Sequence, residues 1–523
     1  MRGNSIVWRA LSRARRDNLA ASGSEAPIAG SSGLTRRRVL AALGAAGAAV
    51  SLAGFKTGEA RPERGTVAIV GGGLAGLTAL RTLRAAGVDA HLYEARSRLG
   101  GRVLTVRDGP VPADFGGQFV NSDHADIIAL AKSFGLGLID RSTLGGRTVV
   151  IDGERVIDEA ELAADLQPIA ARIGADAELL DTDYKRHAPK LDALSVAAYL
   201  DRHADALPKP YLRKLLGSTI RTEFGQEPAE ASALELIFNL PVADGRHVEL
   251  ISTSDERFVL EGGSGMLTDA MARELAPFIT TGQILAGLER SGPGARLRFT
   301  NGRVIEAERA IITVPAPLLR AIDFGNLLPQ PWREYIAEIE LGRNEKLNAA
   351  YRGRPWREGM GLAGDAWPLE GPFAEAWDAT TVSGDIGLLT WFMGGEQVAR
   401  ARNIKPADLR LAFEAAARPV LSGLGESATG WQRRTNWGQD VFTRGAYSCF
   451  RPGQLTRFAR LFWVEEDGKA TQSPSVGPIV FAGEHLSDAW PGYMNGGAQT
   501  GRLAGIEVLQ SLKVQHSAPA LSH

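Results

Sequence analysis

Three glycines and a carboxylate at fixed spacing are the first sign of chemistry in the chain. Gly71, Gly73 and Gly76 follow the apolar run 67–70, and Glu94 closes a second apolar run after an apolar-periodic segment. This order predicts a strand, a helix and a second strand. In such a unit the glycines let the backbone approach a pyrophosphate at the helix N-terminus, and the carboxylate accepts hydrogen bonds from a ribose. The stretch therefore predicts a dinucleotide-binding βαβ unit.

A basic loop behind Glu94 indicates which dinucleotide is bound. Arg96, Gly101 and Arg102 belong to the run E-A-R-x-R-x-G-G-R, in which arginines can neutralise phosphate and paired glycines can lie against a cofactor. This pattern resembles the glutathione-reductase-like flavoproteins, in particular the flavin-containing amine oxidase superfamily. The resemblance implies FAD as the cofactor.

Two further segments match the same family. Residues 113–120 resemble its D-L-G-G-x-[YF]-V segment beside the isoalloxazine ring, which implies that Gly117 and Gln118 contact the cofactor and Phe119 the substrate. The run 257–263 resembles the return of the chain to the FAD domain. In this alignment, Leu285 is the strand residue that packs near the adenine.

Lys346 stands ten residues before Trp356, at the start of a stretch that alternates between polar and apolar residues. The alternation of Leu347, Ala349 and Tyr351 predicts a strand with one buried face. On local grounds, a lysine at the start of such a strand is usually a solvated side chain. The resemblance instead implies a lysine that holds a water against flavin N5 and assists oxygen reduction.

Two C-terminal motifs carry the resemblance furthest. Residues 436–447 match W-x-x-D-x-[FY]-[ST]-x-G-[AC]-Y, and residues 481–497 contain a Gly-Glu-His run followed by W-P-G-Y-M-N-G-G. The resemblance implies that Tyr447 and Tyr493 flank the path of an amine to the flavin. The remaining implied residues are Trp437, Gly483, Glu484 and Met494 at the cofactor and Trp490 at the substrate.

The position of Ala446 bears on how the flavin is held. Covalently flavinylated relatives carry a cysteine at this position, and Cys449 is three residues away. We therefore expect non-covalent FAD. His485 is not expected to act as a base, because an amine that binds unprotonated needs none.

The expected reaction is oxidation of an amine to an imine, which water hydrolyses to an aldehyde and ammonia or a smaller amine, while oxygen becomes hydrogen peroxide. An L-amino acid oxidase is the alternative, although Gln118 and Phe119 stand where those enzymes carry a carboxylate-binding arginine; Arg221 could replace it. A dehydrogenase that passes electrons to a cytochrome is a further alternative. Desaturases, mutases and non-catalytic flavin-binding proteins also remain open.

Residues 1–60 read as a leader. A basic, Ser- and Gly-rich stretch leads to Thr35-Arg36-Arg37-Arg38-Val39-Leu40, a modestly apolar run and small residues up to Ala60. This pattern predicts a twin-arginine signal peptide, so we expect contact with the twin-arginine export machinery. Because that route carries folded proteins, the flavin would be bound before export to the periplasm or the outside of the cell.

We expect an α/β fold with a glutathione-reductase-like FAD-binding domain and an interleaved substrate-binding domain of mixed sheet and helices. The FAD domain is expected from 66–140, 257–340 and 437–512, the substrate domain from 141–256 and 341–436, and a polar tail from 513–523. The 59 basic and 60 acidic residues predict no nucleic-acid partner. One cysteine excludes an internal disulfide, and eight scattered histidines predict no metal site. A homodimer stays open.

Overall fold

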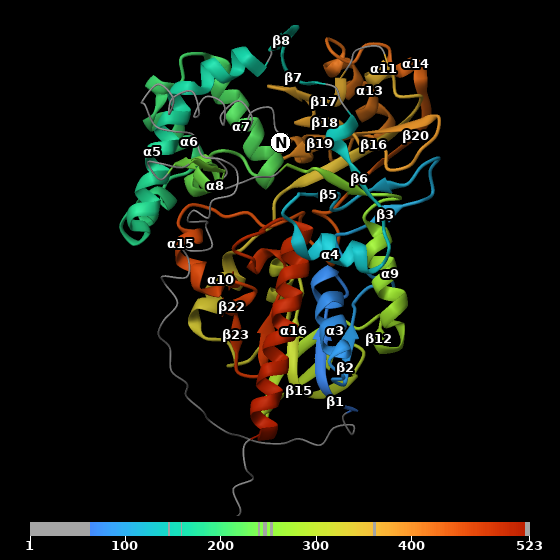
Figure 1. Cartoon of the computed structure of the whole chain (residues 1–523), viewed down its shortest axis with the longest axis vertical. Coiled ribbons are helices and arrows are strands. Elements are labelled where there is room, and N and C mark those ends of the chain that lie inside the picture. The colour runs from blue at the N-terminus through green and yellow to red at the C-terminus, as the bar shows by residue number, and fades with distance from the viewer. Residues whose placement is uncertain are drawn as a thin grey trace, which may run out of the picture. The chain divides into compact units, whose positions relative to one another are not determined.

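The computed structural model describes residues 63–517, apart from 145–146, 158, 239–240, 244–247, 251–254 and 359–361. Within these residues the chain forms two compact units, which can be followed by their labels in Figure 1. We call them the β1 unit, with the residues up to Gly101, Thr268–Ile339 and the residues from Phe458, and the β16 unit, with Arg102–Leu267 and Glu340–Arg457. The predicted leader and the end of the predicted tail lie outside the described residues.

The predicted domain borders divide the chain by expected ligand, with one domain for FAD and one for the substrate. The two compact units instead group residues by how they pack. The borders therefore remain a prediction.

The β1 unit contains the predicted βαβ unit, which is confirmed. Its eight-stranded sheet has the order β12-β2-β1-β15-β14-β13, with β24 beside the second half of β15 and β23 beside β24. The strands next to β1 are parallel to it, which places their carboxyl ends at one edge. The strands are β1 (Glu63–Val70), β2 (Ala90–Tyr93), β12 (Ile279–Thr280), β13 (Leu285–Ser291), β14 (Gly294–Phe299), β15 (Val304–Ile312), β23 (Ser475–Val476) and β24 (Ile479–Phe481).

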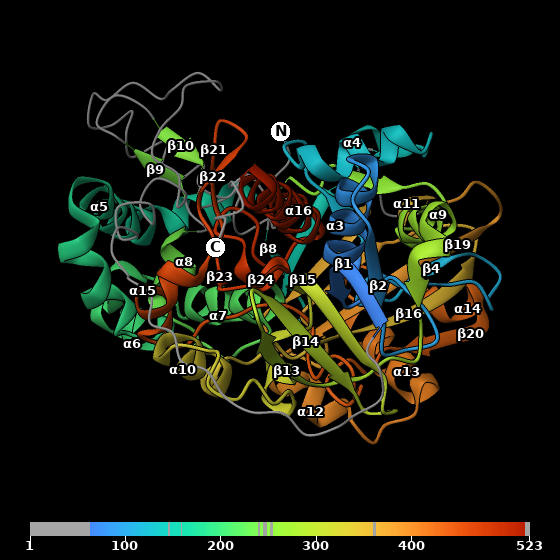
Figure 2. The ribbon, with the colours of Figure 1, turned by 90° about the horizontal axis from the view of Figure 1, so that it is seen from below.

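Helices α3 (Leu74–Ala85) and α16 (Met494–Ser517) pack side by side on one face of this sheet, as Figures 1 and 2 both show. Glycines make this approach possible. A Cβ at Gly501 would lie 2.2 Å from Ala75 O, and one at Gly505 would lie 2.9 Å from the Thr82 side chain. The third helix of the unit is α10 (Gln330–Glu338), and a small hairpin is formed by β21 (Val464–Glu466) and β22 (Lys469–Gln472).

The β16 unit is built on a seven-stranded sheet of order β20-β16-β19-β18-β17-β7-β8. The strands are β7 (Arg147–Asp152), β8 (Arg155–Ile157), β16 (Asn344–Arg352), β17 (Leu362–Pro368), β18 (Glu375–Asp378), β19 (Ile386–Gly394) and β20 (Ala428–Arg434). Smaller sheets add β3 (Thr105–Val106) with β4 (Ala113–Asp114), β5 (Phe119–Val120) with β11 (Phe258–Leu260) and β6 (Leu138–Asp140), and β9 (Pro241–Ala243) with β10 (Val248–Leu250).

The helices of the β16 unit include the long α5 (Glu159–Asp192) and α7 (Pro210–Phe224). Pro210 begins α7 at a position where its missing N–H costs nothing, and Gly225 ends it. The others are α4 (Ala125–Ser133), α6 (Val196–Arg202), α8 (Ala233–Phe238), α11 (Pro355–Glu358), α12 (Glu396–Ala401), α13 (Pro406–Ala417) and α14 (Leu424–Ser427). The unit borders fall inside α9 (Gly265–Leu275) and α15 (Gln454–Phe458).

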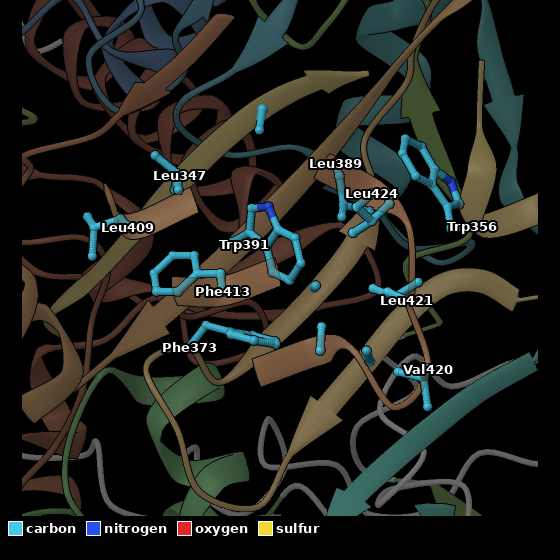
Figure 3. Packing of buried hydrophobic residues seen from close by; sticks show 14 of the residues in the cluster. Leu347, Trp356, Phe373, Leu389, Trp391, Leu409, Phe413, Val420, Leu421 and Leu424 are labelled. Atoms are coloured by element: carbon cyan, nitrogen blue, oxygen red, sulfur yellow. The ribbon is translucent and has the colours of Figure 1, made fainter. Parts of the chain in front are cut away.

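Strand β16 is buried on both faces, so the prediction of one buried face is wrong. Leu347 and Tyr351 lie in an apolar core with Trp391 of β19 and Phe413 of α13 (Figure 3). The opposite face carries polar side chains that are nevertheless buried, Lys346 among them. Alternation revealed the apolar face, whereas the cover over the polar face comes from a distant segment.

Two helices of the described residues, α5 and α16, are long. Across the part of the chain that the structure describes, no helix combines the length and the apolar character needed to cross a membrane.

Candidate active site

The turn between β1 and α3 contains three glycines, and the surroundings of each glycine differ. Gly71 has φ 109°, and a Cβ there would lie 2.4 Å from Thr313 Oγ1. A Cβ at Gly76 would lie 1.9 Å from Gly71 O, so glycine lets the helix pack against the strand. At Gly73 the nearest atom to such a Cβ would be Gly101 Cα at 4.0 Å. The second glycine thus leaves open space at the helix N-terminus, as a bound pyrophosphate requires.

Glu94 follows β2, with its side chain buried beside this turn. Its carboxylate accepts from Gly72 N at 2.5 Å and from Arg96 N at 2.8 Å. Two backbone donors fix the carboxylate without using all of its acceptor sites, so ribose hydroxyls can still be accepted. Gln283 N donates to Glu94 O, and Leu285 follows two residues later as a buried residue of β13. The predicted adenine contact of Leu285 stays a prediction.

The glycine pair of the basic loop lies against the same turn. Gly100 N donates to Gly72 O at 2.8 Å, and Gly101 has φ 58° with its virtual Cβ 3.2 Å from Gly73 Cα. Arg98 Nη1 bonds the carbonyls of its own loop. Arg102 belongs to the β16 unit, where its Nη1 donates to Ala446 O at 2.8 Å. Neutralisation of phosphate by these arginines stays a prediction.

The second predicted cofactor segment of the β1 unit folds around Glu484. Glu484 Oε2 accepts from Gly492 N at 2.6 Å, and Gly483 before it has φ 143°. Trp490 N donates to Ser487 Oγ at 2.9 Å, which shapes the loop ahead of α16. Helix α16 begins at Met494, so its positive N-terminal end meets this loop. Tyr493, half-buried, is the residue before that helix.

In the β16 unit the side chain of Lys346 is buried, and its ammonium is hydrogen-bonded to one short segment. Its ammonium donates to Gly116 O at 2.9 Å, to Gln118 Oε1 at 3.0 Å and to Asp114 O at 3.4 Å. Its main chain exchanges hydrogen bonds with Thr435 at 2.8 and 2.9 Å. Among the described residues, no carboxylate accepts from this ammonium. The cation is therefore held by neutral oxygens alone.

This environment sets the protonation of Lys346. Burial lowers the pKa of Lys346 to about 8, and the charges of Asp114 and Glu256 oppose that change only in part. Burial also raises the pKa of the Asp114 carboxyl, against the hydrogen bond from Thr105. The lysine therefore changes charge close to physiological pH, which is typical of groups that take part in chemistry.

One aromatic ring lies near the ammonium of Lys346, and two further rings pack against it. Its Nζ lies 5.5 Å from the centroid of the Trp377 ring, which lies 5.3 Å from both the Phe119 and the Phe392 rings. Trp377 Nε1 also donates to Gln118 Oε1 at 3.3 Å. The sequence analysis found Phe119 but missed Trp377 and Phe392. The register of β18, β19 and β16 brings them together, and no local pattern encodes that register.

Gln118 has an unpartnered donor. Its Oε1 accepts from Lys346 and Trp377, while its Nε2, also buried, has no hydrogen-bond partner among the described residues. Buried amide nitrogens are rarely left without an acceptor. An acceptor on the isoalloxazine ring would satisfy it, so this side chain fits the predicted cofactor contact. Gly117, one residue earlier, donates to Arg102 O at 3.1 Å.

Residues 436–447 are hydrogen-bonded to the segment 114–118 and to the end of α7. Trp437 Nε1 donates to Phe115 O at 2.9 Å, and the Tyr447 phenol donates to Thr222 O. Ala446 offers no nucleophile for a covalent bond to the flavin. Tyr447 belongs to the β16 unit and Tyr493 to the β1 unit, so their predicted pairing stays a prediction.

Two arginines of the β16 unit bear on the choice between amine and amino acid. Arg221, the predicted alternative partner for a carboxylate, bonds Glu227 through its Nε at 2.9 and 3.0 Å and through Nη2 at 2.8 Å. Arg141 lies with its guanidinium 4.4 Å from the Phe119 ring centroid and donates to Glu256 O at 3.2 Å. The fork of Arg221 is thus occupied by an internal carboxylate. Arg141 also faces an internal carboxylate, since its Nη1 lies 3.7 Å from Glu256 Oε2, but its guanidinium contacts the ring of a predicted substrate residue.

Within residues 63–517, outside the gaps named above, no group of three His, Cys, Asp or Glu side chains is placed to hold a metal ion.

The glycine geometry makes a specific prediction. In Gly73→Ala the new Cβ should enter open space, so thermal unfolding of the apoprotein should change little, while FAD binding should weaken by about tenfold or more because the methyl group competes with the pyrophosphate. A fluorescence titration of apoprotein with FAD measures this. Gly76→Ala is the control: its Cβ collides with Gly71 O, so it should lower the melting temperature itself. Equal FAD affinity for Gly73→Ala and the unchanged protein would contradict the assignment.

Comparison with known sequences identifies the family. The profile of the flavin containing amine oxidoreductase family matches residues 74–509. AofH of Mycobacterium tuberculosis, whose name describes a flavin-containing monoamine oxidase, is 28% identical over 469 residues, which cover 84% of this chain and 96% of AofH. Amine oxidase [flavin-containing] B of Cavia porcellus is 25% identical over 467 residues, covering 85% and 86% of the two chains.

Solved structures share the fold. Cyclohexylamine oxidase from Brevibacterium oxydans has a TM-score of 0.74 at 24% identity, covering 86% of this chain and 99% of its own. Putrescine oxidase bound to putrescine also has a TM-score of 0.74, at 22% identity, covering 86% and 100%. These likenesses confirm the predicted α/β fold. Since the family profile matches most of the chain, the protein belongs to the flavin containing amine oxidoreductases and is an oxidoreductase that uses FAD.

Proposed function

We propose that the protein oxidises an amine to an imine, which water hydrolyses to an aldehyde and ammonia or a smaller amine, and that oxygen is the electron acceptor and becomes hydrogen peroxide. The observation that carries this proposal is the buried Lys346 ammonium, held by three neutral oxygens next to the Trp377 ring. Bound FAD supplies the acceptor for the hydride of the amine α-carbon and the electrons for oxygen.

The residues of the β16 unit have separate roles in this proposal. Phe119, Trp377 and Phe392 form an apolar, electron-rich wall that favours a neutral amine with an apolar substituent. Gln118 offers its free Nε2 donor to the flavin. Lys346 presents a positive charge where negative charge develops during oxygen reduction. Its longest hydrogen bond, to Asp114 O, is the one most easily exchanged for a water.

An amine fits these observations better than an amino acid. Arg221 is already paired with Glu227, so it lacks a free fork for a substrate carboxylate. The names of the similar proteins also point to amines: a monoamine oxidase, a cyclohexylamine oxidase and a putrescine oxidase. An L-amino acid oxidase is the second candidate, because the Arg141 guanidinium lies over the Phe119 ring.

A substrate panel tests this order. Primary and secondary amines should reduce the flavin anaerobically and release peroxide in air, whereas L-amino acids should do neither at matched concentration. Turnover of amino acids alone would make the second candidate correct. Arg141→Ala separates the two: it should abolish amino acid turnover if that arginine binds a carboxylate, and should leave amine turnover nearly intact. If air fails to reoxidise the reduced enzyme while a cytochrome succeeds, the protein is a dehydrogenase.

Lys346 gives the oxygen step a pH dependence. Its pKa of about 8 makes it a cation below pH 8 and neutral above, so the rate of flavin reoxidation by oxygen should fall as pH rises through 8. In Lys346→Met, reoxidation should be slower by about 100-fold, and the inflection near pH 8 should vanish. Stopped-flow mixing of reduced enzyme with oxygen measures both.

The reductive half-reaction is the internal control for that variant. It should rise with pH through the effective pKa of the amine in both enzymes, because the neutral amine is the reacting form. If the inflection near pH 8 persists in Lys346→Met, another group is responsible.

We further propose export by the twin-arginine route to the periplasm or the outside of the cell, supported by Thr35-Arg36-Arg37-Arg38-Val39-Leu40 and the apolar run behind it. A homodimer stays open. Replacement of Arg36 and Arg37 by lysine should keep the protein in the cytoplasm with its FAD bound. Cell fractionation followed by flavin absorbance measures this, and unchanged export of the doubly substituted protein would contradict the route.

A further inference from the structure

The carboxyl end of α7 is a junction at which three parts of the β16 unit meet. Gly225 follows the helix with φ 62°, the left-handed conformation that ends many helices. A Cβ at Gly342 would lie 2.2 Å from Phe224 O, and one at Gly394 would lie 2.0 Å from Arg221 O. Glycines thus let the residues before β16 and the end of β19 approach the last turn of α7 directly.

Asn344, the first residue of β16, closes this junction with its side-chain amide. Its Nδ2 donates to Arg221 O at 2.9 Å and to Thr222 O at 3.3 Å. These carbonyls belong to the last turn, where a helix has few backbone donors left; Arg221 O also accepts from Gly225 N at 3.0 Å. Asn344 Oδ1 lies against Gly225, where a Cβ would be only 2.1 Å away. The two carbonyl acceptors set the orientation of the amide, and its buried Oδ1 has no hydrogen-bond partner among the described residues.

Both the phenol and the main chain of Tyr447 are hydrogen-bonded to this junction. Its phenol donates to Thr222 O, which also accepts from Asn344 and has two lone pairs for the purpose. In the main chain, Gly342 N donates to Tyr447 O at 2.7 Å and Ala446 N donates to Gly342 O at 2.8 Å. The place of the tyrosine ring is therefore set by the last turn of α7 and by the residues just before β16.

We propose that Asn344 is a positioning residue, which fixes the Tyr447 ring for the amine through the Thr222 carbonyl. Its catalytic consequence rests on the proposed function, in which Tyr447 borders the path of the amine. Without Asn344, the last turn of α7 loses its side-chain tie to β16, and the acceptor of the Tyr447 phenol is free to move.

Lys346 provides the internal contrast. It lies two residues further along β16, but its main chain is bonded to Thr435 and its ammonium to residues 114–118. None of these bonds involves α7. Loss of Asn344 should therefore disturb amine oxidation and spare the oxygen step.

The kinetic test compares Asn344→Ala with a control on the same helix. Thr219 is buried in α7 and donates to Leu215 O at 3.0 Å, so Thr219→Val removes one helix hydrogen bond away from the junction. In Asn344→Ala holoenzyme, kcat/KM for the amine should fall by about 10- to 100-fold, as displaced groups near a reacting centre do. Flavin reoxidation by oxygen should be unchanged, and Thr219→Val should alter neither. A parallel loss in both half-reactions, or an equal loss in Thr219→Val, would show a general structural role and overturn the proposal.

A second measurement does not depend on turnover. Amide hydrogen exchange at Gly342 and Ala446 should quicken in Asn344→Ala and stay unchanged in Thr219→Val, because only the first variant frees the junction. Unchanged exchange at Ala446 overturns the proposal whatever the substrate is. If the parent enzyme oxidises no amine while exchange still responds to Asn344, the proposed function fails and the positioning role stands.

A double substitution tests whether Asn344 and Tyr447 act through the same carbonyl oxygen. If both groups act through Thr222 O, Asn344→Ala should have a smaller effect on kcat/KM in a Tyr447→Phe background than in the parent enzyme. Full additivity would mean that Asn344 acts by another path and would overturn the assignment.

Discussion

The burial of one ammonium group organises the β16 unit. A charged nitrogen taken out of water must be hydrogen-bonded, and Lys346 receives three oxygens from residues 114–118. A second tie holds this segment across the polar face of β16, since Asn348 Nδ2 donates to Asp114 O at 3.2 Å and Thr390 Oγ1 donates to Asn348 Oδ1. All three acceptors of the ammonium are neutral oxygens. The cation therefore makes three hydrogen bonds but gains little electrostatic stabilisation from them. A carboxylate in their place would raise the pKa of Lys346 and fix its charge.

The two faces of β16 contribute to the position of Lys346 in different ways. The apolar face packs Leu347 and Tyr351 into the core around Trp391 and Phe413, which leaves the strand little freedom to shift (Figure 3). The polar face presents Lys346 to the segment that carries Gln118 and Phe119. Sites supported by a packed strand are held more tightly than sites on loops alone. A strand with both faces buried is therefore suited to keep a titrating side chain at a fixed distance from neighbouring rings.

Local chemistry made parts of this protein predictable from the sequence. The turn of Gly71, Gly73 and Gly76 and the carboxylate of Glu94 are defined by short-range spacing, so their strand, helix and strand follow directly. The burial of Lys346 depends on contacts more than 200 positions away along the chain, and alternation in its own strand gave only half of its environment. Trp377 and Phe392 could not be predicted as site residues, because the register between two strands cannot be inferred from the sequence of either strand alone. The pairing of Arg221 was also invisible in the sequence: its partner Glu227 lies just beyond the end of α7, where a turn brings the two side chains together.

Glycine shows most clearly what structure adds to sequence. Gly76 and Gly501 are required because a Cβ would strike a backbone oxygen, and Gly342 and Gly394 are required for the same reason at the end of α7. Gly73 differs from all of these: its φ of −77° suits any residue, and a Cβ there would meet no atom closer than 4.0 Å. The protein's own packing gives no reason for glycine at this position, which agrees with the predicted approach of the FAD pyrophosphate at the start of α3. Glycines in the sequence thus differ in meaning: Gly76, Gly501, Gly342 and Gly394 are required by the protein's own packing, whereas the space at Gly73 is open for the predicted cofactor contact.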